Sequence, residues 1–152
     1  MKNSGDYLTF SLGSLNFGII ATDVLELNKN LEVTHVPKSP VSVRGITNLR
    51  GQLVPAVDMY QRLGMVNSNG NTETIGIILK SRAMNVALLV DSVGEILSLD
   101  EGTFEAPPSN FPEMSRELVF GVHKLTQKLL LMLDHTKLIG GIQASNKQFL
   151  LN

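Results

Sequence analysis

The chain has 152 residues, of which 43% are hydrophobic and 18% charged. This length fits one domain, or one domain with two lobes, and the apolar content is sufficient for a packed core. The net charge of −1 and the 5% of aromatic residues, without Trp, argue against nucleic acid or an anionic membrane as a binding partner. The absence of Cys excludes disulfides, thiolate catalysis and Cys-based metal sites.

The first residues lack the apolar core of a signal peptide, and the longest apolar runs are far shorter than a membrane span. We therefore expect a cytoplasmic protein that does not insert into a membrane.

Apolar and polar residues alternate along most of the chain, which predicts a mainly β protein. One hairpin is expected from residues 8–12 and 15–19, joined by Gly13-Ser14, and another from residues 75–80 and 86–90. Further strands are expected at residues 24–27, 44–49, 53–57, 93–97, 119–125 and 129–133.

Two short helices are predicted. Asp58 is expected to cap a helix ending at Gly64, and Asp134 another ending at Gly140. The Pro-containing stretch Glu105–Glu117 is expected to form a loop.

The second half of the chain repeats features of the first. Residues 17–27 align with residues 86–96, so that Glu26 matches Glu95. Further along, the first half matches the second in the pairs Gly45/Gly121, Leu49/Leu125, Asp58/Asp134 and Gly64/Gly140. We therefore predict two lobes, each closed into a small barrel, because closure removes exposed strand edges.

The polar run in the middle of the chain sets the expected boundaries. The first β-barrel lobe is placed at residues 6–65, a linker at 66–74, the second lobe at 75–140 and a C-terminal tail at 141–152.

The sequence predicts no catalytic, cofactor or metal site. His35, His123 and His135 do not have metal-ligand spacing, and surface or structural roles are favoured for them. A nucleophile elbow and a glycine-rich phosphate loop are both absent from the sequence. Capping explains the carboxylates of Asp58 and Asp134.

The most distinctive segment is Arg44–Asp58. Gly51 predicts a tight turn or a bulge that points Arg50 outward, and Pro55, which cannot donate a backbone hydrogen bond, is expected at a sheet edge or bulge. The repeat has Thr126-Gln127 where this segment has Arg50-Gly51. Because the hairpin does not require the arginine, a role for Arg50 at the surface is favoured.

Together these motifs resemble the CheW-like coupling proteins of bacterial chemotaxis. The resemblance covers residues 6–140 and rests on Tyr7–Gly13, Phe17-Gly-Ile, Val24-x-Glu26, Arg44–Asp58 and Val86-x-Leu-Leu-Val-Asp-x-Val. It implies a single CheW-like domain of two SH3-like five-stranded β-barrel lobes, without catalytic activity.

The resemblance also implies partners. Such proteins join the cytoplasmic tip of a chemoreceptor to the regulatory domain of a CheA-type histidine kinase, and through these partners they are recruited to membrane-bound receptor arrays. Receptor helices are expected in an apolar groove between the lobes. Glu26 and Arg50 are implied to pair near this groove, and the surface is implied to include Val24, Gly45 and Asn48.

The Glu26–Arg50 pair has two possible roles. A partly exposed ion pair contributes about 0–1 kcal/mol to stability, which favours an interface role over a strut for the hairpin. Alternative functions are a CheW-like scaffold of a parallel pathway for surface motility or second-messenger control, a small β-barrel hydrolase or sugar-binding enzyme, and a nucleic-acid-binding barrel. The enzyme would need a convergent polar pocket, and the nucleic-acid-binding barrel would need clustered positive charge.

Overall fold

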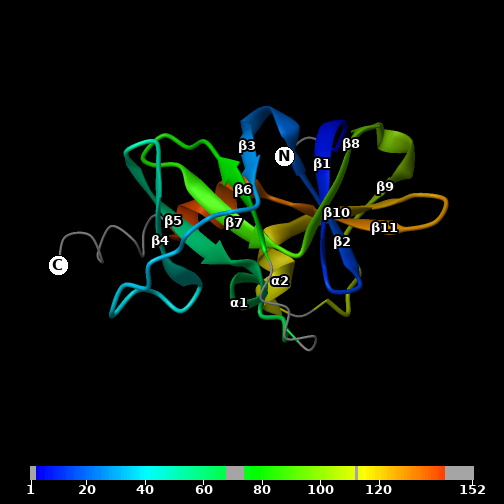
Figure 1. The fold of residues 1–152 in the computed structure, drawn as a ribbon. Helices are drawn as coiled ribbons and strands as arrows, with labels where there is room; N and C mark the ends of the chain where they lie inside the picture. The colour runs from blue at the N-terminus through cyan, green and yellow to red at the C-terminus, as the bar shows by residue number, and fades with distance from the viewer. Residues whose placement is uncertain (1–2, 68–73, 112, 143–152) are drawn as a thin grey trace.

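The structure, a computed structural model, describes residues 3–67, 74–111 and 113–142. Figure 1 shows two β-sheets side by side, with short helices near their junction. Among the described residues, the first sheet has the strand order β8 (Ser92–Leu99), β1 (Gly5–Leu12), β2 (Leu15–Ile20), β11 (Leu129–Leu133), β10 (Val119–Lys124) and β9 (Phe104–Glu105). The second has the order β3 (Val24–Asn28), β6 (Ile75–Leu79), β7 (Val86–Val90), β5 (Gln52–Asp58) and β4 (Val43–Leu49).

The predicted strands are all present at or near their expected positions. The two-residue strand β9 is not predicted by the sequence pattern. The expected loop at Glu105–Glu117 is wrong in part, because it contains the helix α2 (Glu113–Leu118). Two 3-10 turns, η1 (Ala21–Asp23) and η2 (Glu101–Thr103), lead into β3 and β9.

Both predicted helix starts are confirmed. Asp58 caps α1 (Met59–Leu63), which ends at Gly64 in the left-handed conformation with a φ of 69°. Asp134 precedes a helix at residues 135–142, and its side chain accepts a hydrogen bond from the Lys137 N–H at 3.1 Å. This helix continues past Gly140, where it is predicted to end, because Gly140 does not adopt a positive φ.

The lobes are not contiguous in the sequence. The β1–β2 hairpin pairs with β8 and with β11, whereas the β6–β7 hairpin pairs with β3 and with β5. The expected division into lobes at 6–65 and 75–140 is therefore wrong, since each sheet takes one hairpin from the other half of the chain. The physical reason is that the alternating pattern requires each hairpin to bury an apolar face but does not determine which sheet covers it.

The internal repeat is nevertheless present, with its hairpins exchanged. When β1, β2, β8, β10 and β11 are matched with β6, β7, β3, β4 and β5, the two sheets have the same strand order apart from the added β9. The parallel pairs β11–β2 and β5–β7 correspond to each other. Register shifts also recur at matched positions, between Val43 and Gly45 and between Val119 and Gly121.

Three groups of buried side chains form the core of the protein. A central core lies between the sheets, and each sheet has a smaller core on its other face. Strand β7 contributes to two of them, with Val86, Leu88 and Val90 in the central core and Ala87 and Leu89 in the smaller one. Burial on both faces explains the uninterrupted apolar run of this strand.

Each sheet with its smaller core forms one SH3-like lobe of this mainly β fold. The first sheet has six strands rather than the predicted five, because β9 adds to β10. The predicted edge or bulge position of Pro55 is also wrong in part. Strand β5 is an interior strand, but its ladder to β7 begins only at Ala56, so no β7 partner is opposite Pro55.

The predicted linker at 66–74 and tail at 141–152 fall mostly outside the described residues, and these two boundaries stay predictions. In the part of the chain that the structure describes, no helix has the length and apolar character needed to cross a membrane.

Candidate functional site

The β4–β5 hairpin closes with a two-residue turn at Arg50 and Gly51. Leu49 pairs with Gln52, and the φ angles of 51° at Arg50 and 84° at Gly51 are those of the turn that best fits twisted hairpins. The Asn48 side-chain oxygen accepts a hydrogen bond from the Gly51 N–H at 3.0 Å. The left-handed conformation costs a residue such as arginine roughly 1 kcal/mol. The predicted tight turn is confirmed, and the arginine occupies a strained position in it.

Arg50 extends from this turn toward β3. Its Nη2 atom lies 2.6 Å from Oε2 of Glu26, and the Arg50 side chain is 84% exposed while that of Glu26 is 23% exposed. Strands β3 and β4 are the two edges of the second sheet. The ion pair therefore links the two edge regions of that sheet, which are far apart in strand order.

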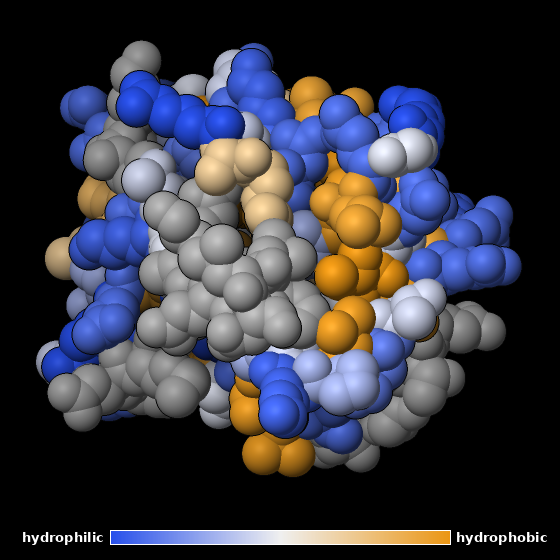
Figure 2. All heavy atoms as spheres, turned by 90° about the vertical axis from the view of Figure 1, so that its left-hand side faces the viewer, coloured by the Kyte–Doolittle hydropathy of each residue, from blue (hydrophilic) through white to orange (hydrophobic). Residues whose placement is uncertain are grey.

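The pair lies beside a small cavity and exposed apolar side chains. Glu26 and Arg50 line a cavity of about 250 Å³ together with Leu25, Leu49, Gln52, Val54, Ile78 and Asn85. On β3, the side chains that flank Glu26 are open to solvent, with Leu25 at 52% and Leu27 at 48% exposure. Figure 2, which faces the side where β4 and β5 lie in Figure 1, shows a vertical band of hydrophobic atoms with hydrophilic atoms to its right. A charged and oriented guanidinium thus stands next to apolar surface, a combination that suits protein recognition.

The other three predicted surface residues, Val24, Gly45 and Asn48, have structural contacts of their own. Val24 is half-buried and packs against the central core. Gly45 is buried, and a Cβ atom there would collide with the backbone carbonyl of Thr34. Asn48 is exposed, but its side chain holds the turn. The structure therefore brings Glu26 and Arg50 into contact, while Val24 and Gly45 shape the backbone that supports them.

The matching hairpin of the first sheet lacks this pair. Strands β10 and β11 turn at Thr126-Gln127, where the Leu125 N–H donates to the Lys128 carbonyl at 2.9 Å. Within the described residues, Glu95 on β8 makes no ion pair. As the sequence comparison suggests, the hairpin forms without an arginine.

Two of the three histidines, His123 and His135, have structural partners. His123 is completely buried, with Nδ1 at 2.8 Å from the Thr103 hydroxyl, and burial lowers its pKa. Nε2 of His135 lies 2.7 Å from Oδ2 of Asp23, a contact that the spacing of the two residues in the sequence does not reveal. Among the described residues, no group of three His, Asp or Glu side chains could hold a metal ion.

Comparison with known proteins agrees with this arrangement. The model of the CheW-like domain family matches residues 6–143. The chemotaxis protein CheW of Klebsiella aerogenes is 28% identical over 134 residues, which cover 88% of this chain and 81% of the relative. Protein FrzA of Myxococcus xanthus is 29% identical over 58 residues, covering 38% of this chain and 36% of that protein.

A solved structure shares the fold. The crystal structure of the scaffolding protein TtCheW from Thermoanaerobacter tengcongensis has a TM-score of 0.76 and 28% identity, over 86% of this chain and 89% of that one. The strand pattern, the Arg44–Asp58 motif and the family match over nearly the whole sequence lead to one conclusion: this chain belongs to the family of CheW-like domains.

Proposed function

We propose that this protein is a non-catalytic adaptor that couples the cytoplasmic tips of chemoreceptors to the regulatory domain of a CheA-type histidine kinase. Membership in the CheW-like family and the similarity to a scaffolding protein support this proposal. In this role the protein acts in the cytoplasm and joins membrane-bound receptor arrays through its partners.

The observation that carries the proposal is the state of Arg50. A strained turn holds this residue, Glu26 orients its guanidinium, and most of its side chain remains open to solvent. An exposed ion pair adds little to the free energy of folding. The arrangement is therefore better explained by a partner that binds the oriented guanidinium. The exposed Leu25 and Leu27 beside it offer the partner apolar contact area.

The first experiment is a calorimetric titration of this protein into the regulatory domain of the CheA-type kinase encoded in the same genome. Saturable one-to-one binding supports the adaptor function. The absence of binding at high micromolar concentrations would contradict coupling to that kinase.

A second titration uses a receptor cytoplasmic fragment with Glu26→Gln, Arg50→Ala and, as a control, Lys29→Ala. Lys29 is an exposed cation without a described ion pair, so its loss changes the net charge by the same amount as the loss of Arg50. We expect the first two variants to bind the fragment more weakly and the control to bind it as the natural protein does. Equal binding by all three variants would exclude the Glu26–Arg50 pair from the receptor surface.

A second candidate function is that of a CheW-like scaffold in a parallel chemosensory pathway, such as one controlling surface motility or a second messenger. The partial similarity to Protein FrzA supports this second candidate function. Titration against each CheA-type kinase of the same genome would separate the two candidates, because the kinase that binds most tightly identifies the pathway.

A further inference from the structure

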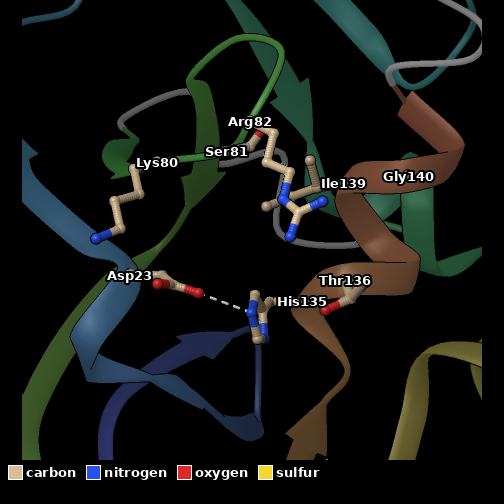
Figure 3. Close-up of a pocket in the computed structure, with 8 residues that line it drawn as sticks. All are labelled: Asp23, Lys80, Ser81, Arg82, His135, Thr136, Ile139 and Gly140. Carbon is tan, nitrogen blue, oxygen red and sulfur yellow. Dashed lines mark ion pairs between the residues drawn. The ribbon is translucent and has the colours of Figure 1, made fainter.

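A cavity of about 660 Å³ lies apart from the Arg50 hairpin. Its walls come from η1, from the loop between β6 and β7, and from the first turns of the helix at residues 135–142 (Figure 3). None of the five residues of the predicted coupling surface lines it. Its size is within the range of roughly 300–1,000 Å³ that is typical of small-molecule sites.

Two cations on the β6–β7 loop line this cavity without a counter-ion. Neither Lys80 nor Arg82 takes part in an ion pair within the described part of the chain. Figure 3 shows the guanidinium of Arg82 turned into the space above His135. Arg44, by contrast, pairs with Asp58 at 3.1 Å.

The carboxylate in the cavity wall is already engaged. Oδ2 of Asp23 lies 2.7 Å from Nε2 of His135, as the dashed line in Figure 3 marks. Among the described residues, Asp23 has this contact with His135 and no ion pair with Lys80 or Arg82. The lining side chains carry a net positive charge, although the chain as a whole has a net charge of −1.

We propose that this cavity binds a phosphorylated small molecule. Arg82 would hold the phosphate, because a guanidinium forms paired hydrogen bonds to phosphate oxygens. The ammonium of Lys80, which Figure 3 shows turned away from Arg82, would add a compact positive charge to the rim of the cavity. The Thr136 hydroxyl, also in the wall, is a further donor. The cavity is larger than a phosphate ion alone, and Ile139 offers apolar contact to the rest of the molecule.

The position of the cavity predicts how a bound ligand would affect the stability of the protein. Segment η1 joins β2 of the first sheet to β3 of the second, while the helix at residues 135–142 follows β11 of the first sheet and adds Leu138 and Ile142 to the central core. A ligand held between these segments would connect the crossover from the first sheet to the second with this core-packed helix, and would stabilise the paired lobes against unfolding.

Sodium pyrophosphate is the probe, titrated calorimetrically at constant ionic strength, with amide chemical shifts used to locate the site. We expect saturable binding at one site, with shifts confined to residues 80–82 and 135–136. The double variant Lys80→Ala/Arg82→Ala should bind at least about tenfold more weakly. Lys29→Ala, which removes one positive charge elsewhere, should bind unchanged.

Three results would overturn the proposal: no saturation by pyrophosphate, equal binding by the double variant, or equal weakening by Lys29→Ala. Glutarate at the same concentration tests the carboxylate alternative, and saturation by glutarate without saturation by pyrophosphate would also overturn the phosphate assignment. Circular dichroism verifies that the double variant is folded, and if it is not, Arg82→Gln alone takes its place with the same expected weakening.

Discussion

The hydroxyl of Tyr60 donates a hydrogen bond of 2.5 Å to Oδ2 of Asp91 and so connects α1 to the turn between β7 and β8. The same carboxylate oxygen accepts a hydrogen bond of 2.7 Å from the Gly13 N–H in the β1–β2 turn. The Asp91 carboxylate therefore connects α1, which follows the second sheet, to the β1–β2 hairpin of the first sheet. Burial, and then the hydrogen bond to Asp91, raise the pKa of Tyr60 to about 12.

The first prediction concerns this contact. Tyr60→Phe keeps the ring but leaves Asp91 with one hydrogen bond fewer, so we expect the free energy of unfolding to fall by about 1.5–3 kcal/mol. Urea denaturation at pH 7 measures the change. An unchanged unfolding free energy would show that the bond adds nothing to the joint between the lobes.

The raised pKa of Tyr60 predicts that the protein loses stability at alkaline pH. Because the pKa of Tyr60 is higher in the folded protein, its contribution to stability is complete below pH 10, the ordinary tyrosine value, and is lost as the pH rises through about 12. Unfolding free energies measured between pH 9 and pH 12 should decline less steeply in Tyr60→Phe. Tyr7, whose pKa burial also raises, is present in both proteins and contributes to the remaining slope.

Arg50→Gly separates the two roles of the Glu26–Arg50 pair. Glycine relieves the left-handed strain of roughly 1 kcal/mol, which offsets the roughly 0–1 kcal/mol lost with the ion pair. We therefore expect an unfolding free energy within about 1 kcal/mol of the natural value, together with weaker receptor or kinase binding. Arg50→Lys is the matched control, since it keeps the charge but loses the planar fork. If the unfolding free energy fell by several kcal/mol while binding stayed intact, the pair would instead be a structural strut for the hairpin.

A pair of glycine substitutions tests the support beneath the surface. Gly45→Ala places a Cβ against the Thr34 carbonyl and should destabilise the protein by about 1–3 kcal/mol. Gly140→Ala meets no atom within 4 Å and lies in a helix, so it should stabilise by about 0.5–1 kcal/mol. Thermal unfolding of both variants is the measurement, and equal melting temperatures would contradict the packing of the Thr34 segment on β4.

His123 predicts a loss of stability toward acid pH. Burial lowers the pKa of this side chain below the ordinary value of 6.5, so the unfolded chain takes up the proton first. Its contribution to stability is complete above pH 6.5 and is lost as the pH falls. Urea denaturation between pH 8 and pH 5 should show a shallower decline in His123→Gln than in the natural protein. If the unfolding free energies of the two proteins declined equally steeply, His123 would be excluded as the source of the acid sensitivity.

Much of the local structure was predictable because short-range rules govern it. Alternation located the strands, Asp58 and Gly64 delimited α1, and Gly51 marked the turn that exposes Arg50. Helix α2 was missed because its six residues lie in a Pro-containing stretch that carries turn signals, and β9 because two residues show no period. The ion pair of Glu26 with Arg50 was expected only through the family resemblance, since no periodicity joins β3 to the β4–β5 turn.

By itself the sequence determined a mainly β chain with an internal repeat, its strands and caps, and its membership in a recognisable family. The tertiary structure alone decided that the hairpins are exchanged between the sheets, that Gly45 is buried under Thr34, and that Asp23 meets His135. The reason is that alternation and capping depend on neighbours along the chain. The partner of a strand, or of a charge distant in sequence, depends instead on which apolar faces the whole chain can bury at once.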